Sequence, residues 1–205
     1  MKVLTYKSED NLDKVVEQLQ KGKLVVYPTD TIYGIAANIN DTKAIKKVYS
    51  TKERSPSKPL SVCFHDLDQL KDYVVLNHTL TEIIKKLLPG SYTLLLYKKE
   101  NINPILTSNS PIVGVRIPKN IVSYKLTEHF PITSTSANIS NEKTPDNIYE
   151  IQKQLGDKID CYIDGGLTTN NKASTIIDLT KEKPYIIRKG TYDKKLLNEI
   201  LKINL

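Results

Sequence analysis

Cysteine is scarce in this sequence of 205 residues: only Cys63 and Cys161 occur, far apart from one another. Two distant cysteines form neither a disulfide framework nor the paired spacing of a zinc site. The histidines, His65, His78 and His129, are scattered too widely to form a metal site. Both cysteines stand in apolar, strand-like segments, so we expect buried thiols and no metal-binding residues.

Long apolar runs are also missing. No stretch reaches the roughly 18 apolar residues of a membrane span. The N-terminal sequence MKVLTYKSEDNLDKVV has charges where a signal peptide needs an apolar run. Hydrophobic residues make up 39% of the chain and charged residues 26%, which is compatible with one substantial core. We therefore expect a cytoplasmic protein with a single domain over residues 1–205 and no membrane contact.

Arginine is rare in a chain that is strongly basic. Lysine and arginine together number 30 and the net charge is +7, a surplus that attracts polyanions. Only Arg54, Arg116 and Arg188 are arginines. Because lysine supplies the generic charge, these three are candidates for sites that need a planar guanidinium fork, which can bind carboxylate or phosphate by two bonds. Each could instead pair with a carboxylate inside the protein.

The spacing of apolar residues indicates short helices and strands in alternation. We expect helices over 9–21, 41–51, 67–75, 79–88, 121–129, 148–155 and 196–201. We expect strands over 23–27, 58–64, 92–97, 112–117, 131–135, 159–163, 174–179 and 185–188. Because these elements do not follow a regular βαβ rhythm, we predict an α/β fold in which helices flank a mixed sheet.

Polar segments follow several of these elements. Pro28-Thr-Asp-Thr31 comes after a buried strand, where open sheets often bind ligands, although a plain turn would have a similar composition. Lys52-Glu-Arg-Ser-Pro-Ser-Lys58 holds three cations within seven residues, which suits a polyphosphate or a solvated basic loop. Ser134-Thr-Ser-Ala-Asn-Ile-Ser140 offers hydroxyls and an amide to a nucleotide, or a cap to a helix.

Arg116 stands inside an apolar strand. Its neighbours Val115 and Ile117 point to the opposite face of the sheet. Its guanidinium must then meet a carboxylate, a ligand or a polar cleft, because an unpaired buried charge is unfavourable. The residue type alone leaves a bound ligand and an internal partner equally open.

Common catalytic motifs are absent. The sequence has neither GxxxxGK[ST] nor GxGxxG, so the two common phosphate loops are excluded. It also lacks the GxSxG nucleophile elbow. Polar residues do begin one predicted strand, at Ser174, and end another, at Arg188. If the protein is an enzyme, we expect it to act by positioning and charge stabilisation rather than through a covalent intermediate.

Seven segments resemble, in the same order, the YrdC/TsaC family of threonylcarbamoyl-AMP synthases. They are VVYPTDTIYGIAAN, KERSPSKPLSV, PGSYTLLL, VGVRIP, TSTSANIS, STIIDLT and IIRKG. The resemblance runs from about Lys23 to Gly190. The KxR…SxN signature of the family corresponds to Lys52, Arg54, Ser136 and Asn138. One segment alone is weak evidence, but seven in order are specific.

The resemblance implies a YrdC-like fold, a twisted open α/β sheet with a basic concave face. It implies a nucleotidyltransferase that converts L-threonine, bicarbonate and ATP, with Mg²⁺, into threonylcarbamoyl-AMP and pyrophosphate. The product would serve the modification of an adenosine next to the anticodon of tRNA. The implied partners are a tRNA threonylcarbamoyl-transferase complex, which receives the product, and tRNA itself through the basic face. The chain ends soon after IIRKG, so we expect no extra C-terminal domain of the long family form.

The resemblance also assigns roles to residues. The catalytic residues would be Lys52 and Arg54. The ATP-binding residues would be Arg54, Lys58, Ser136, Asn138, Thr144 and Arg188. The threonine-binding residues would be Thr31, Arg116, Ser134 and Ser174. Long family members carry a histidine near threonine at the position of Cys63. Cys63 would be a threonine-binding residue only if it takes the place of that histidine. Many members have glycine at the position of Asn141, a residue that tolerates the left-handed conformation.

Two other functions stay open. The chain could adenylate a different carbamoyl group, as the similar domain of hydrogenase-maturation proteins does with carbamoyl phosphate. That role usually comes with zinc-finger and acylphosphatase modules, for which this chain has too few cysteines and residues. It could instead be a non-catalytic module that binds double-stranded RNA or tRNA. Such a module would not need Arg116 in an apolar strand beside serine and threonine hydroxyls.

Overall fold

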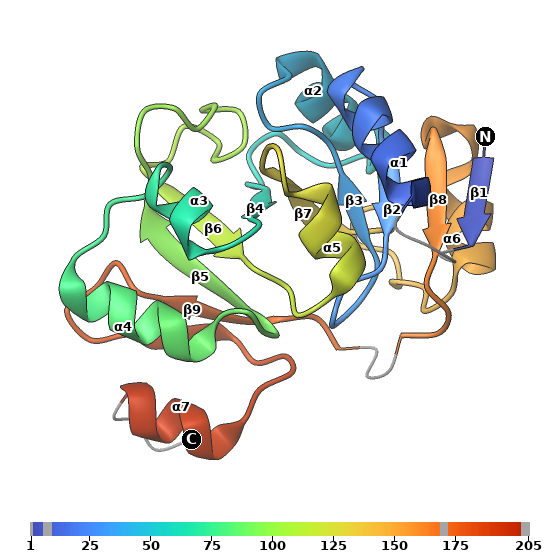
Figure 1. The fold of residues 1–205 in the computed structure, drawn as a ribbon. Coiled ribbons are helices and arrows are strands. Elements are labelled where there is room, and N and C mark those ends of the chain that lie inside the picture. Colours follow the sequence, from blue (N-terminus) through green and yellow to red (C-terminus); the bar gives the residue numbers. More distant parts are fainter. Residues whose placement is uncertain (1, 6–9, 169–171, 202–205) are drawn as a thin grey trace.

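The computed structural model describes residues 2–5, 10–168 and 172–201, and its centre is a mixed sheet flanked by helices (Figure 1). The strands are β1 (Lys2–Thr5), β2 (Val25–Tyr27), β3 (Gly34–Ala36), β4 (Ser61–Cys63), β5 (Tyr92–Tyr97), β6 (Ile112–Arg116), β7 (Ile132–Ser136), β8 (Cys161–Asp164), β9 (Thr175–Asp178) and β10 (Tyr185–Arg188). The helices are α1 (Asp10–Gln20), α2 (Thr42–Thr51), α3 (Leu67–Lys71), α4 (His78–Leu87), α5 (Ile121–Leu126), α6 (Ile148–Leu155) and α7 (Lys194–Leu201), and a 3₁₀ turn covers Gly156–Lys158.

The sheet is continuous through ten strands in the order β1-β8-β2-β3-β7-β4-β6-β5-β9-β10. The pairs β1–β8, β2–β8, β4–β6 and β5–β9 are parallel, and the other neighbours are antiparallel. The predicted α/β fold with a mixed sheet is therefore confirmed. Within the described part of the chain, no helix has the length and apolarity to cross a membrane.

The main differences from the predicted elements concern one helix and two strands. The helix predicted over 67–75 ends at Lys71, and Val74 instead forms an isolated antiparallel bridge with Lys98. The predicted helix over 9–21 corresponds to α1, with residue 9 outside the described residues. Strands β1 and β3 were not predicted. β3 contains glycine and alanine, which are weak strand formers, and a Cβ at Gly34 would lie only 3.0 Å from the Tyr27 ring.

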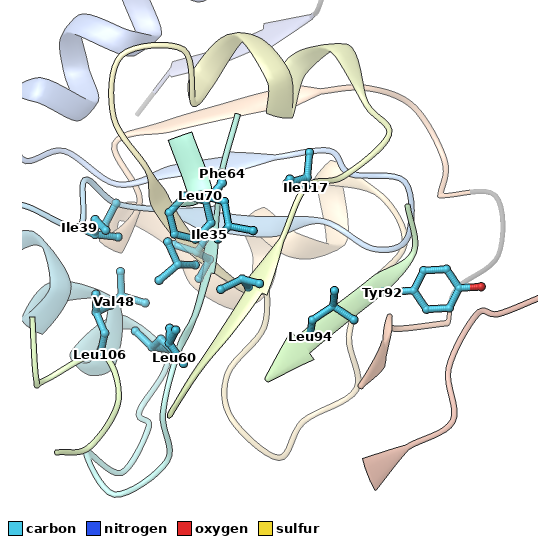
Figure 2. Close-up of a cluster of buried hydrophobic side chains, with 14 of the residues drawn as sticks. Ile35, Ile39, Val48, Leu60, Phe64, Leu70, Tyr92, Leu94, Leu106 and Ile117 are labelled. Atoms are coloured by element: carbon cyan, nitrogen blue, oxygen red, sulfur yellow. The ribbon is translucent and has the colours of Figure 1, made fainter. Parts of the chain in front are cut away.

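Apolar clusters hold helices on both faces of the sheet. On one face, α1 and α5 pack over β2, β3, β7 and β8 through a cluster that includes Leu19, Leu126 and Ile132. On the other face, a larger cluster packs the sheet against the remaining helices (Figure 2). Cys63 and Cys161 are both buried in the first cluster, which confirms that the two thiols are buried.

The face beneath α1 and α5 changes from apolar to polar along the strands. In β7, Ile132 packs in the apolar cluster, whereas Ser134 and Ser136 line a cavity. In β4, Cys63 packs in the same cluster and Ser61 lines the cavity. Residues two apart in a strand share a face. The cavity therefore continues the sheet face that the two helices cover elsewhere.

Candidate active site

The cavity has a volume of about 660 Å³, within the range of about 300–1,000 Å³ usual for ligand sites. Strands β3 to β7 and β9 to β10 contribute to its wall, together with loops next to them in the chain. Its described lining includes four cations, Arg54, Lys58, Arg116 and Arg188, and no acidic side chain. Low-dielectric walls with charge of one sign concentrate anions. The cavity therefore suits a ligand with several negative charges.

The structure brings most of the predicted site residues together. Those that line the cavity are Arg54, Lys58, Arg116, Ser134, Ser136, Thr144, Ser174 and Arg188. Lys52, Asn138 and Thr31 are buried and bond to lining residues from behind. Cys63 is fully buried in the apolar cluster and does not belong to the described cavity wall.

Lys52 joins the two halves of the KxR…SxN signature. Its side chain is buried, and Nζ donates to the carbonyl oxygen of Ser136, to that of Asn138 at 2.7 Å and to Asn138 Oδ1 at 3.3 Å. Burial and, to a smaller extent, the charge of Arg54 lower the pKa of Lys52 to about 7. The three oxygen acceptors oppose this shift because they favour the ammonium form. Lys52 thus ties the end of α2 to the loop that follows β7.

Arg54 and Lys58 lie in the loop between α2 and β4. Arg54 donates from Nε to the Lys58 carbonyl oxygen at 3.0 Å and from Nη2 to that of Pro59 at 2.8 Å, so one guanidinium edge shapes its own loop. Lys58 Nζ reaches across to Asn141 Oδ1 at 3.2 Å. Asn141 has φ +72°, the left-handed conformation that asparagine tolerates. This contact links the two polar loops of the cavity.

The conformation of Asn141 gives a stability prediction. Replacement by valine should lower the free energy of unfolding by about 1–2 kcal/mol, because a β-branched residue is strained at positive φ, whereas glycine should be nearly neutral. Urea denaturation followed by circular dichroism measures both. Lys143→Val, at an exposed neighbour, is the control for added apolar surface. Equal stability of the valine and glycine variants would contradict this account.

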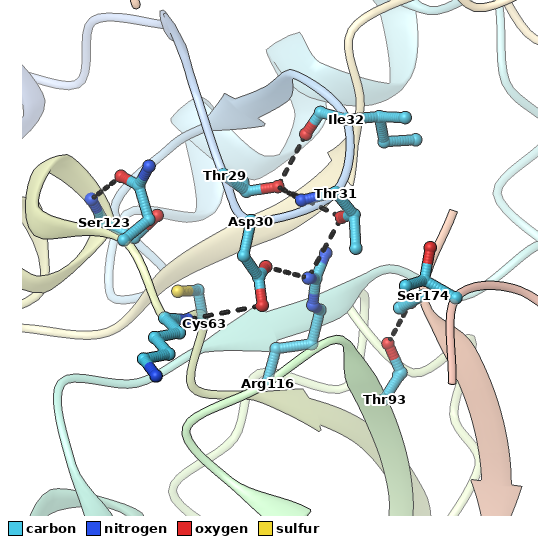
Figure 3. A network of polar contacts seen from close by, with 12 residues as sticks. Thr29, Asp30, Thr31, Ile32, Cys63, Thr93, Arg116, Ser123 and Ser174 are labelled. Atoms are coloured by element: carbon cyan, nitrogen blue, oxygen red, sulfur yellow. Dashed lines mark hydrogen bonds and ion pairs between the residues drawn. The ribbon is translucent and has the colours of Figure 1, made fainter. Parts of the chain in front are cut away.

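Arg116 has an internal partner and also faces the cavity. Its side chain is 7% exposed, and Nη2 donates to Asp30 Oδ1 at 2.8 Å and to Thr31 Oγ1 at 3.1 Å (Figure 3). Nε is buried without a hydrogen-bond partner among the described residues. A ligand carboxylate that took two bonds would have to share Nη2 with Asp30, because Nε and Nη1 do not lie on one edge of the guanidinium. The sequence highlighted the segment of Asp30 but gave that carboxylate no role.

Arg188, Ser174 and Thr93 form a chain of hydrogen bonds. Arg188 donates from Nε and Nη2 to the Ser174 carbonyl oxygen, at 3.2 and 2.8 Å, and from Nη2 to Ser174 Oγ at 3.2 Å. Ser174 Oγ lies 2.7 Å from Thr93 Oγ1. Burial lowers the pKa of Arg188, and the charge of Arg116 lowers it further. Arg188, predicted to bind ATP, therefore contacts Ser174, predicted to bind threonine. Thr93 also lines the cavity, and the sequence analysis did not identify it as a site residue.

Metal-binding side chains are not grouped in this site. Among the described residues, no cluster of three or more His, Cys, Asp or Glu side chains could hold a metal ion. The described cavity wall offers hydroxyls and cations but no carboxylate. A magnesium ion in this cavity would therefore need its anionic ligands from the bound molecule, as Mg²⁺ commonly does with substrate phosphates.

Comparison with known proteins agrees with these features. The Sua5/YciO/YrdC family model, described as telomere recombination, matches residues 17–190. A putative threonylcarbamoyl-AMP synthase of Methanocaldococcus jannaschii is 40% identical over 187 residues, which cover 89% of each chain. P. abyssi Sua5 complexed with L-threonine has a TM-score of 0.92 at 30% identity, over 98% of this chain but 60% of that one. E. coli YciO has a TM-score of 0.86 at 26% identity, over 95% and 97%. The chain belongs to the Sua5/YciO/YrdC family.

Proposed function

We propose that this chain is a threonylcarbamoyl-AMP synthase, which converts L-threonine, bicarbonate and ATP into threonylcarbamoyl-AMP and pyrophosphate. The observation that carries the proposal is that one cavity gathers residues predicted for ATP and residues predicted for threonine. The relatives support it, since curated proteins with 40% and 36% identity are named putative threonylcarbamoyl-AMP synthase and threonylcarbamoyl-AMP synthase. A solved relative also contains L-threonine.

The reaction brings several anions together. The amine of threonine attacks bicarbonate, which gives a carbamate and releases water. A carbamate oxygen then attacks the α-phosphorus of ATP, and the bond to pyrophosphate breaks. A carboxylate, a carbamate and a triphosphate repel one another unless cations hold each in place. The four cations of the cavity wall, without a described carboxylate among its lining residues, meet this requirement.

The positions of the residues suggest a division of labour. Arg54, Lys58 and Thr144 would bind the nucleotide together with the Ser136–Asn138 loop that Lys52 holds. Arg116, Ser134 and Ser174 would bind threonine, and Thr31 would support Arg116. Magnesium would be held by the phosphates of ATP and would neutralise their charge. Catalysis would then consist of positioning and charge stabilisation.

The product would serve the modification of an adenosine next to the anticodon of tRNA. It would be handed to a tRNA threonylcarbamoyl-transferase complex in the cytoplasm. The net charge of +7 would favour direct contact with tRNA through a basic concave face, by long-range attraction to phosphates.

The proposal predicts a definite substrate preference. The purified chain should release pyrophosphate from ATP only when L-threonine and bicarbonate are present. Valine should be rejected strongly, because it leaves the groups that bind the threonine hydroxyl unpaired. Serine lacks one methyl group, worth about 1 kcal/mol, and should be the better of these two wrong substrates. Pyrophosphate release and mass spectrometry of the adenylate measure all three.

Other outcomes would identify the alternatives. Turnover of valine equal to that of threonine would exclude the proposed specificity. Adenylation with carbamoyl phosphate, without threonine, would favour the reaction of the hydrogenase-maturation domains. Tight binding of tRNA without any turnover would favour a non-catalytic RNA-binding module.

A further inference from the structure

Thr93 is a polar residue that faces the cavity from an otherwise mostly apolar strand, β5. It is 3% exposed, and the next residue on its face, Leu95, also lines the cavity. Its methyl carbon Cγ2 lies against Gly114 of β6, where an added Cβ would be 3.3 Å from Thr93 Cγ2 and 2.7 Å from Ser61 Oγ. The hydroxyl of Thr93 lies 2.7 Å from that of Ser174, just before β9 (Figure 3). Packing therefore keeps this hydroxyl against Ser174.

The hydrogen bond from Arg188 to Ser174 has a fixed direction, whereas either hydroxyl can donate in the bond between Thr93 and Ser174. Arg188 can only donate, so its bond from Nη2 occupies one lone pair of Ser174 Oγ. Ser174 is the only hydrogen-bond partner of Thr93 Oγ1 among the described residues. A buried hydroxyl proton needs an acceptor, and Ser174 Oγ keeps a second lone pair that can accept from Thr93. With Thr93 as the donor, the proton of Ser174 is free to point toward the cavity that Ser174 lines.

We propose that Thr93 is a positioning residue that makes Ser174 a hydrogen-bond donor to the carboxylate of the amino-acid substrate. This inference rests on the proposed function. A fixed donor suits an oxygen acceptor and does not suit the protonated amine of threonine. The carboxylate is the substrate group that the neighbouring guanidinium of Arg116 also attracts. Threonine would then lie with its carboxylate toward Ser174 and its amine free to attack bicarbonate.

Nearly isosteric variants test this role. Thr93→Val keeps the volume and removes the donor, so it should weaken the affinity for L-threonine roughly two- to tenfold, as expected for the loss of the one neutral hydrogen bond that orients Ser174. The affinity for ATP should stay within about twofold, since the variant removes no hydrogen bond assigned to ATP. Thr93→Ser, which keeps the hydroxyl, should restore threonine binding. Thr127→Val, at a buried hydroxyl just after α5 that bonds the Ser123 carbonyl, is the matched control and should bind threonine normally.

L-threoninol, which has a hydroxymethyl group in place of the carboxylate, separates positioning from general damage. Isothermal titration should show that Thr93→Val weakens L-threonine but leaves the weaker binding of L-threoninol unchanged. Normal binding of L-threonine by Thr93→Val, or an equal loss for threonine, threoninol and ATP, would overturn the inference. A folded wild-type chain that binds no L-threonine would instead overturn the proposed function and the inference with it.

Discussion

Replacement of Lys52 by methionine should strongly reduce both stability and turnover. Methionine has a similar length but no donor, so the carbonyl oxygens of Ser136 and Asn138 would lose the ammonium that they share. Buried acceptors that lose a charged partner should lower the free energy of unfolding by about 3 kcal/mol. The released loop would also misplace Ser136 in the cavity, and misplacement of this kind can reduce kcat roughly 100-fold.

Thermal melting and a pyrophosphate-release assay at a temperature where the variant is folded measure the two effects. Lys46→Met is the matched control, because Lys46 is an exposed lysine of the same helix, α2. This control should keep normal stability and turnover. A folded Lys52→Met variant with wild-type kcat would show that the loop holds its position without the ammonium.

Much of the fold could be predicted because the apolar spacing is clear. Helix α6 matches the predicted boundaries, and the mixed sheet follows from short elements without a βαβ rhythm. Strand β3 was missed because its residues, Gly34 to Ala36, are weak strand formers, and its place between β2 and β7 depends on pairing partners distant in sequence. Helix α3 was predicted too long because Val74 pairs with Lys98, a contact that no local pattern contains.

Part of the candidate site could also be predicted, from residue composition. The scarcity of arginine indicated Arg54, Arg116 and Arg188, and all three line the same cavity. Their use of protein oxygens was not predictable from spacing. Each guanidinium donates from Nη2 to the protein, to Pro59, to Asp30 or to Ser174. Each Nη1 has no hydrogen bond to a described residue, so one side of each fork stays available to a ligand.

The roles of Asp30 and Thr93 escaped the sequence analysis because they depend on partners far along the chain. Asp30 is separated from Arg116 by 86 positions, and Thr93 from Ser174 by 81. A threonine within an apolar strand is the only local signal for Thr93, and that signal is common in buried strands. Both residues act on other side chains, which is why a motif of ligand-binding residues does not include them.

Replacement of Arg116 by methionine should weaken L-threonine binding by more than about 30-fold, since it removes a charged group from a desolvated site. The single variant cannot assign the residue to binding, however, because it also leaves Asp30 buried without its partner. Loss of one member of a buried ion pair lowers stability by about 3–5 kcal/mol. A purely structural arginine would therefore give the same loss of binding through partial unfolding.

A double-mutant cycle with Asp30→Asn separates the two roles. Asparagine keeps an oxygen that can accept from the Lys119 amide, which bonds Asp30 at 3.3 Å, and it removes the charge that Arg116 balances. In the double variant both charges are gone, so the free energy of unfolding should recover most of the loss, because no buried charge remains unpaired. If Arg116 binds the substrate carboxylate, threonine affinity should stay low in this stable protein while ATP affinity returns to normal. Recovery of threonine binding together with stability would assign Arg116 to structure alone, and calorimetry with each ligand beside a melting curve distinguishes these results.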